Sequence, residues 1–566
     1  MNITAPPQLV YVQRSYTSPA PRQRVTTSEQ QLPPNNASHQ SLASTHYSSY
    51  SNSSLRSSDS TAATSFSTLV STPPPPLPTS TPVNGGPIEA TNSVLNKRAE
   101  KDQSLFQICL SLRQRLEAIP RIKEVLDEEE HAAADDIDPV ELLWRVFRRG
   151  YPLLIVYTAY RPNTSIDTDL SKVAEKNRPK AAAIKFLGGC KKELQMKDED
   201  LFIANEVTDT ENTNGFVKVT RVVNEILDRM VAEGILNSDM FGDAAAVQTA
   251  TGKRTQRQHI VDELVRTERT YVQHLELLQA FKKRVEECGA VSGDTIHDIF
   301  LNLNALLNFQ RKFLIRVEHT NAMAEEDQNW GSLFITSKDA LCEVYEPYIA
   351  NQKRCEEVAM REFEKLKLFE GPVEIRQMVE SPTVLSSFLL KPFQRLSKYP
   401  LLLKELLKNG ELNEHLKADV AEGMEAASWV LQQANVAVDR EERNEAVEDL
   451  KLRVDDWKGH KLEAFGDLLM HGTYTVLKND SAKKDQEREY KIYLFELILL
   501  CCKEVDPTKQ KNKLMNKPLV DARGKPRLQL KGRIFMQNVT DVLKVSPQSS
   551  KGMYLHSSLD GMIANG

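Results

Sequence analysis

The residues that could support covalent chemistry do not stand at the spacing such chemistry requires. Thr251–Arg254 reads TGKR and contains the Gly-Lys pair of a phosphate-binding loop. Val247, however, stands where that loop needs its first glycine, and Arg254 replaces the Ser or Thr that would hold magnesium. The sequence contains no HExxH, GxSxG or kinase-type motif, and its 11 histidines are scattered. We therefore predict no catalytic residue, no metal site and no cofactor, and we expect an activity that consists of binding.

A candidate binding carboxylate lies in Gln258–Phe281, which has the period of an amphipathic helix. The apolar positions form one stripe that we expect to face a core: Ile260, Leu264, Tyr271, Leu275 and Leu278. Glu263 lies about 100° around the helix from Leu264, on the polar side. Taken alone, Glu263 is best interpreted as a solvated surface carboxylate.

A second candidate lies in Phe388–Lys408, a helix-forming segment interrupted by two prolines. An interior proline costs a helix about 3 kcal/mol, so we expect something specific to compensate. Pro392 can occupy a first turn, whereas Pro400 should kink the helix. Gln394 and Lys398 are four residues apart and therefore share a face. The alternative is a kinked core helix with a lysine that reaches to solvent.

A third segment, Leu416–Glu442, has near-heptad apolar spacing typical of a long packed helix. The predicted seam consists of Leu416, Val420, Met424, Ala427, Leu431, Ala434 and Val438. The opposite flank is polar and is either plain solvent surface or a partner face: Ser428, Gln432, Asn435, Asp439 and Glu442.

The 566 residues that must position these segments are too many for one core, so we expect several domains. Residues 1–95 are rich in Ser, Thr and Pro and are predicted to be disordered. Their Pro73–Pro78 run is either an SH3-type ligand or a stiff spacer. Helical periodicity begins at Leu105, with further helices expected at Val140–Phe147, where Asp138 is the expected cap, and at Val217–Ile235.

Other parts of the chain are assigned by composition. Tyr151–Tyr160 is either a short buried helix or a strand, and 237–256 reads as a linker. Residues 257–445 predict an elongated helical bundle. Strands are then expected within Asp467–Lys478, Glu489–Glu504 and Arg527–Leu543. With few strands and no closing helix, this β-rich region is predicted to be incomplete.

Charge and cysteine usage exclude several classes of function. The net charge of -5 gives no cationic field for nucleic acid. The seven cysteines lack metal-binding spacing and indicate reduced thiols in a cytosolic protein. The N-terminus does not have the pattern of a secretory signal, and the apolar run Ile492–Cys502 is too short to span a bilayer. Any membrane contact is expected to be peripheral.

Three segments together resemble the Dbl-homology domains of Rho guanine-nucleotide exchange factors. ELVRTERTYVQHL at Glu263–Leu275 resembles the first conserved region of that family, and LKPFQRLSKYPLLLKEL at Leu390–Leu406 resembles the third. YEPYIANQKRCEEV at Tyr345–Val358 resembles the segment between them. Asp138–Tyr160 is similar to the calponin-homology domain of fungal polarity exchange factors, and Gly466–Lys478 to the start of a pleckstrin-homology domain.

The resemblance implies a multidomain, mainly α protein. It would have a calponin-homology-like domain at 104–236, a Dbl-homology domain at 257–445 and a truncated, β-rich pleckstrin-homology domain at 460–566. The implied function is to accelerate GDP release from a Rho-family GTPase that controls cell polarity and actin organisation, without covalent chemistry.

The resemblance also implies functions for individual residues. Glu263 would face switch I of the GTPase and Lys398 the acidic part of switch II. Gln394 and Asn435 would contribute to the same surface. Ser397 would help to select among GTPases.

Two other classes of function are weighed against exchange. One is a helical scaffold linked to actin through the calponin-homology region. The other is a lipid-binding adaptor, in which Lys483, Lys484 and Arg488 contact anionic headgroups. Polarity scaffold proteins and membrane phosphoinositides are further candidate partners, and the expected location is cytoplasmic with peripheral recruitment to the cell cortex or polarity sites.

Overall fold

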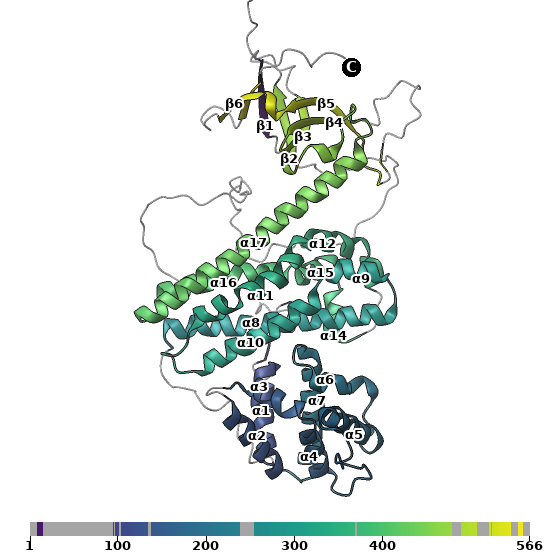
Figure 1. The fold of residues 1–566 in the computed structure, drawn as a ribbon, viewed down its shortest axis with the longest axis vertical. Helices are drawn as coiled ribbons and strands as arrows, with labels where there is room; N and C mark the ends of the chain where they lie inside the picture. Colours follow the sequence, from purple (N-terminus) through teal and green to yellow (C-terminus); the bar gives the residue numbers. More distant parts are fainter. Residues whose placement is uncertain are drawn as a thin grey trace, which may run out of the picture. The chain divides into compact units, whose positions relative to one another are not determined.

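The computed structural model describes residues 8–14, 94–95, 97–100, 103–133, 137–237, 254–367, 371–477, 488–505, 520–521, 523–544 and 553–557. These residues form an upstream helical region, a bundle of longer helices and an antiparallel sheet (Figure 1). This arrangement confirms the predicted fold class, mainly helical with a β-rich C-terminal part. Residues 238–253, most of the expected linker, lie outside the described residues.

The upstream region packs short helices around an apolar core. Its main helices are α1 (Leu105–Glu117), α2 (Pro120–Ala132), α3 (Pro139–Arg148), α4 (Tyr151–Tyr160), α5 (Arg178–Lys192), α6 (Ala204–Thr208) and α7 (Thr213–Ala232). Large side chains that are almost fully buried fill the core: Phe147, Tyr157, Phe186 and Phe216. The predicted cap is confirmed, because the Asp138 carboxylate accepts from Val140 N and Glu141 N, both at 2.9 Å. The helix expected at Val217–Ile235 begins four residues earlier.

The segment Tyr151–Tyr160 is a helix. Gly150 at φ 73° starts it, and seven of its ten residues are buried, from several sides of the helix. A helix enclosed on more than one side has no polar stripe, so its sequence lacks the 3.6-residue period that separates a helix from a buried strand. This is why periodicity left the two alternatives open.

The bundle contains most of the long helices of the chain (Figure 1). Its members are α8 (Gln256–Cys288), α9 (Gly293–Phe300), α10 (Leu303–Ala322), α11 (Trp330–Ala350), α12 (Gln352–Arg361), α13 (Phe363–Leu366), α14 (Val373–Met378), α15 (Pro382–Leu389), α16 (Lys391–Asn409) and α17 (Glu414–Arg453). Thr255 and Gln258 form a capping box at the start of α8, and Gly289, at φ 61°, ends that helix.

Helices α11 and α17 pack against each other through a glycine contact. A Cβ placed on Gly423 would lie 2.4 Å from the Cα of Gly331, so the two backbones approach more closely than side chains allow. Asp419 of α17 also accepts from Gly331 N and Ser332 Oγ, both at 2.6 Å, at the first turn of α11.

The predicted seam of α17 is partly wrong in its register. Met424, Leu431 and Val438 are only half-buried, whereas their preceding neighbours Gly423, Val430 and Ala437 are buried. The prediction followed large apolar residues, but the close contact with Gly331 of α11 requires the small residue Gly423 on the buried side.

The sheet has seven strands in the order β5-β4-β3-β2-β1-β7-β6, and every pair is antiparallel. The strands are β1 (Gln8–Arg14), β2 (Leu468–Leu477), β3 (Arg488–Phe495), β4 (Ile498–Glu504), β5 (Leu528–Phe535), β6 (Val539–Lys544) and β7 (Met553–Ser557). The strands expected within 467–543 are confirmed. β1 lies within residues 1–95, so the prediction of disorder is wrong for Gln8–Arg14. Its residues Val10–Val12 have the composition of a strand.

The last turns of α17, and Val454 directly after them, contribute to the core of this sheet. Leu450 and Val454 are buried in one apolar cluster with Phe495, Leu500 and other strand residues. Arg453 is buried beside them and donates to Glu504 at 2.7 Å and to the carbonyl of Pro526 at 2.8 Å. One continuous helix therefore joins the bundle to the sheet (Figure 1).

Candidate functional site

The predicted GTPase-facing residues lie on three helices of the bundle. Glu263 is exposed on α8, and Gln394 and Lys398 are exposed one turn apart on α16. Asn435, on α17, is half-buried. Since α16 packs against both α8 and α17, these side chains belong to neighbouring helices.

Helix α16 accommodates both prolines of its motif. Pro392 lies in the first turn, as predicted, and is buried. Pro400 lies inside the helix, which continues to Asn409. Ser397 is half-buried, and its hydroxyl donates to the carbonyl of Gln394 at 3.0 Å.

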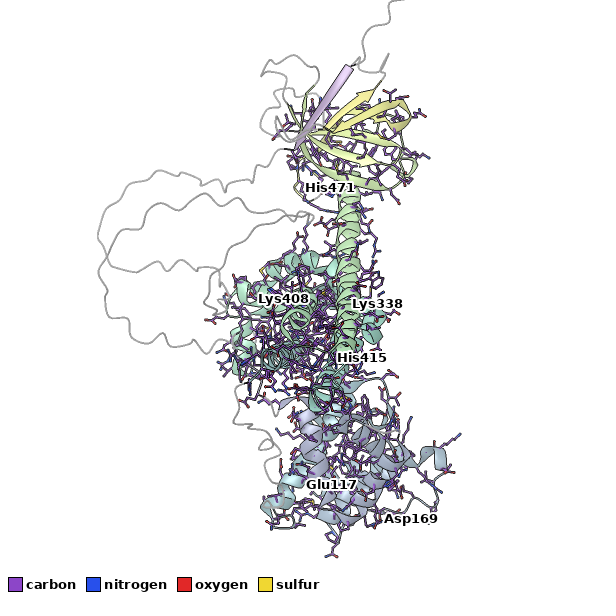
Figure 2. The ribbon with its side chains drawn as sticks, turned by 90° about the vertical axis from the view of Figure 1, so that its left-hand side faces the viewer. Glu117, Asp169, Lys338, Lys408, His415 and His471 are labelled. Carbon is purple, nitrogen blue, oxygen red and sulfur yellow. The ribbon has the colours of Figure 1, made fainter. Side chains whose placement is uncertain are left out.

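Helix α17 has bundle helices on both of its flanks. In Figure 2, Lys408 of α16 and Lys338 of α11 lie on opposite sides of α17. On the α11 side, the Lys338 ammonium lies 4.1 Å from the ring centroid of Trp429, and Arg440 pairs with Glu346 at 2.8 Å.

A buried ion pair joins α16 to α8 directly beneath the exposed residues. Arg395 Nε donates to Glu268 Oε2 at 2.8 Å, Nη1 donates to Thr267 Oγ1 at 2.8 Å, and Nη2 reaches the Leu264 carbonyl at 3.3 Å. The two charged side chains are 6% and 0% exposed. Burial opposes the charge of Arg395, but Coulombic attraction to Glu268 outweighs it, so the pKa of Arg395 is raised. Arg395 therefore stays protonated in the core.

Polar groups from two further helices complete this cluster, which we call the polar hub: Glu268, Tyr271, Gln310, Tyr345, Arg395 and Tyr399. Gln310 of α10 donates to Glu268 and, at 2.9 Å, to the Tyr399 hydroxyl. Tyr345 of α11 donates to Gln310 Oε1 at 2.8 Å and lies 3.0 Å from the Tyr271 hydroxyl. Burial and the field of Glu268 raise the pKa of Tyr399, which stays protonated.

The sequence analysis did not single out the polar hub, although a signal was present. Glu268 stands at the i+4 position from Leu264, on the apolar stripe of α8, and Arg395 precedes Tyr399 by four residues on the buried side of α16. A charged residue on each of two apolar stripes requires an opposite charge in the core. Complementary charges on two core faces therefore predict such a pair.

Other predicted features are placed as follows. Lys483 and Lys484 lie outside the described residues, and Arg488 opens β3 but its side chain is also outside them. Among the described residues, no cluster of three or more His, Cys, Asp or Glu side chains is arranged to hold a metal ion. Within the same part of the chain, no helix is both long and apolar enough to cross a membrane.

Comparison with known families assigns three domains. Residues 260–435 match the family model of the RhoGEF domain, residues 138–227 match the CDC24 calponin model, and residues 463–563 match a pleckstrin homology domain. The chain therefore carries a RhoGEF, or Dbl-homology, domain between a calponin-type domain and a pleckstrin-homology domain. All four predicted contact residues lie within the RhoGEF match or at its last position.

The chain is also similar to two fungal proteins. It is 31% identical over 475 residues to Rho guanine nucleotide exchange factor scd1 of Schizosaccharomyces pombe, covering 80% of this chain and 52% of the relative. It is 30% identical over 381 residues to Cell division control protein 24 of Saccharomyces cerevisiae, covering 65% of this chain and 43% of the relative. The chain thus spans about half the length of these curated relatives.

Among solved structures, the chain is similar to one chain of the crystal structure of human RhoA in complex with the DH/PH fragment of PDZRHOGEF. The TM-score is 0.40 at 16% identity, and the match covers 55% of this chain and 92% of the other. This likeness is too weak to assign a function.

Proposed function

We propose that this protein is a guanine-nucleotide exchange factor that accelerates GDP release from a Rho-family GTPase. The observation that carries the proposal is the RhoGEF match over 260–435, which includes the exposed Glu263 and Lys398. The names of the two fungal relatives, a Rho guanine nucleotide exchange factor and a cell division control protein, support it.

The proposed mechanism is differential binding without covalent chemistry. A small GTPase holds its nucleotide through phosphates, magnesium and ordered switch loops. A partner that binds these loops better in a nucleotide-free arrangement must weaken nucleotide binding by linkage. Such a partner needs charged groups held at fixed positions on a rigid surface, and packed helices supply that surface.

Within this mechanism, the side chains have separate functions. Glu263 contacts switch I and Lys398 contacts the acidic part of switch II, while Gln394 and Asn435 contribute hydrogen bonds. A charge-assisted hydrogen bond is worth about 1.5–3 kcal/mol, so the loss of Glu263 or Lys398 should slow release by roughly ten- to a hundredfold. Ser397, next to Lys398, contributes to the choice among GTPases.

The test is release of a fluorescent nucleotide from a panel of Rho-type GTPases in the presence of the full chain. At least one GTPase should release GDP faster. Glu263→Ala and Lys398→Ala should each remove most of the acceleration while circular dichroism is unchanged. If the folded chain accelerates no member of the panel, the proposed function is wrong.

Two control variants match these substitutions. Lys404→Ala removes an exposed lysine of α16 that lies about 120° around the helix from Lys398. Glu286→Ala removes an exposed carboxylate near the opposite end of α8 from Glu263. Both should keep wild-type exchange. Equal losses in the controls would indicate a general charge effect and refute the assigned contacts.

Membrane and scaffold contacts are further parts of the proposal. Lys483, Lys484 and Arg488 would bind phosphoinositides and recruit the protein peripherally to the cell cortex, where polarity scaffold proteins would bind it. Co-sedimentation with phosphoinositide vesicles should decrease when the three residues are replaced by alanine. The competing actin-linked scaffold predicts co-sedimentation with filamentous actin through the calponin-type domain and no acceleration of GDP release.

A further inference from the structure

The guanidinium of Arg395 binds α8 close to Glu263, a proposed GTPase contact. Its acceptors on α8 are the Leu264 carbonyl, the Thr267 hydroxyl and the Glu268 carboxylate, all within five residues of Glu263. On α16, Arg395 itself precedes Lys398 by three residues, which is less than one helical turn. Arg395 therefore connects the helices that carry Glu263 and Lys398 directly, as does the Tyr399 hydroxyl, which donates to Glu268 at 3.1 Å.

Three acceptors on one helix restrict how α16 can lie on α8. The guanidinium is planar and its donors point in fixed directions, so it can meet the three α8 acceptors in few orientations. The Leu264 carbonyl belongs to the helix backbone, so this contact also limits sliding of α16 along α8. The site is buried, and thus water cannot easily replace a lost contact.

The polar hub extends this restriction to the other helices. Gln310 and Tyr345 connect Glu268 to α10 and α11. Helix α11 in turn packs on α17 through Gly331 and Gly423. The position of α17, which carries Asn435, is therefore also linked to the polar hub through α11.

We propose that Arg395 and Glu268 are positioning residues for nucleotide exchange, which hold α16 on α8 so that Lys398 and Glu263 meet the GTPase at a fixed separation. This inference rests on the proposed exchange function. A buried ion pair often stabilises a fold no more than apolar residues of the same volume. Orientation of the two helices is the property that the pair supplies and apolar packing would not.

The decisive variant is Arg395→Lys in the full chain. Lysine keeps a positive charge beside Glu268, so the carboxylate is not left unpaired, but it cannot reach all three acceptors. A displacement of about 1 Å at an active surface can cost a hundredfold in rate. We expect the rate of GDP release at saturating protein to fall about ten- to a hundredfold while circular dichroism is preserved.

A second buried Arg–Glu pair on the same helix provides a matched control. Arg269 Nε donates to Glu318 of α10 at 2.6 Å, and these side chains are 12% and 1% exposed. This pair joins α8 to α10 and does not involve α16. Arg269→Lys should therefore lower the melting temperature much as Arg395→Lys does, and leave exchange unchanged. Equal loss of exchange in both variants would overturn the proposal.

The Thr267 hydroxyl tests the same contact without changing any charge. Thr267→Val removes the acceptor of Arg395 Nη1 and should slow exchange, whereas Thr267→Ser keeps the hydroxyl and should restore it. This pair of variants keeps the proposal testable if Arg395→Lys does not fold. Equal exchange rates in the valine and serine variants would overturn it.

A double-mutant cycle separates positioning from an independent contribution. If Arg395 acts through Lys398, Arg395→Lys should cause little further loss in a Lys398→Ala background. Losses that multiply fully would contradict the proposal, as would wild-type exchange in folded Arg395→Lys. Both outcomes require an active wild-type chain, so they are distinct from failure of the proposed function, in which the wild-type chain itself accelerates no GTPase.

Discussion

The two helical regions of this chain are stabilised in different ways. Among the described residues of 103–236, the buried polar side chains are Ser104, Thr213 and Thr220, and none of them is ionisable. In the bundle, Glu268, Glu318 and Arg395 are buried together with several polar residues. Apolar packing is thus sufficient to hold helices together, and the bundle carries buried charge where the proposed contact helices α8 and α16 cross. Of the two regions, buried charge is therefore a property of the bundle, and among its described pairs only Arg395–Glu268 joins α8 to α16.

The largest expected effect comes from removing one member of the polar hub. Glu268→Ala leaves Arg395 buried without its partner, which costs about 3–5 kcal/mol of unfolding free energy. Phe186→Ala in the upstream region should lower the free energy of unfolding by about 3–5 kcal/mol, because it leaves a cavity. Denaturant unfolding and GDP release should both be measured, with release measured where each variant remains folded. Glu268→Ala should lose exchange and Phe186→Ala should keep it. The comparison fails if both variants lose exchange alike.

The second prediction concerns acid, which should affect the bundle first. Burial, together with the charge of Lys391, lowers the pKa of His274 in α8 to about 4 from 6.5. Below pH 6.5 the His274 side chain is therefore protonated in the unfolded chain, whereas in the folded bundle it stays neutral until about pH 4. As the pH falls from 6.5 to 4, the free energy of unfolding should decrease by about 3 kcal/mol. His274→Phe should remove this pH dependence, measured by hydrogen exchange of bundle amides. A wild-type bundle equally stable at pH 6.5 and pH 4.5 would contradict it.

The upstream region should respond at lower pH. Hydrogen bonds from Tyr157 and Ser165 lower the pKa of Glu193 to about 2 from 4.5. Its contribution to stability is present above pH 4.5 and is lost as the pH falls toward 2. Between pH 4.5 and pH 2, the stability of the wild-type upstream region, measured by hydrogen exchange of its amides, should therefore fall more steeply than that of Glu193→Gln. Between pH 4.5 and pH 6.5 the two forms should give parallel curves, and parallel curves below pH 4.5 as well would contradict the prediction.

A smaller effect is expected at the contact of α11 and α17. The Cβ of Gly423→Ala would meet the Gly331 backbone, and overpacking of this kind typically costs about 1–3 kcal/mol. Because α17 carries Asn435, exchange should decrease as well. Ala418→Ser, on an exposed part of the same helix, is a suitable control. A Gly423→Ala protein with wild-type melting and wild-type exchange would show that the close contact is not required.

The smallest effect is expected on the α11 side of the bundle. Lys338→Ala removes the ammonium that lies over the Trp429 ring, and an exposed contact of this type is worth about 0.5–1 kcal/mol. Lys338 lies on the opposite side of α17 from Lys408 of α16 in Figure 2. GDP release should therefore equal that of the wild type. A marked loss would mean that the functional surface extends around α17.

Much of this architecture is predictable from periodicity, and the failures have physical reasons. The core stripe of α8 was predicted because its apolar residues repeat every 3.6 positions on one side of the helix. The register of α17 was missed because small residues, and not large ones, face α11 at the glycine contact. The exposed Glu263 and Lys398 were found only through family motifs, since a surface charge has no local signal of function. Their placement on adjacent helices required the structure.

The continuous course of α17 has a practical consequence for dividing the protein. Leu450 and Arg453 lie in the last turns of α17, but Leu450 packs in the apolar core of the sheet and Arg453 binds Glu504 of β4. A fragment ending at residue 445 would strip the strands of an apolar cover and of the guanidinium that binds Glu504. A fragment beginning at residue 460 would expose the same strands to aggregation. A fragment that contains either the bundle or the sheet should therefore include the whole of α17.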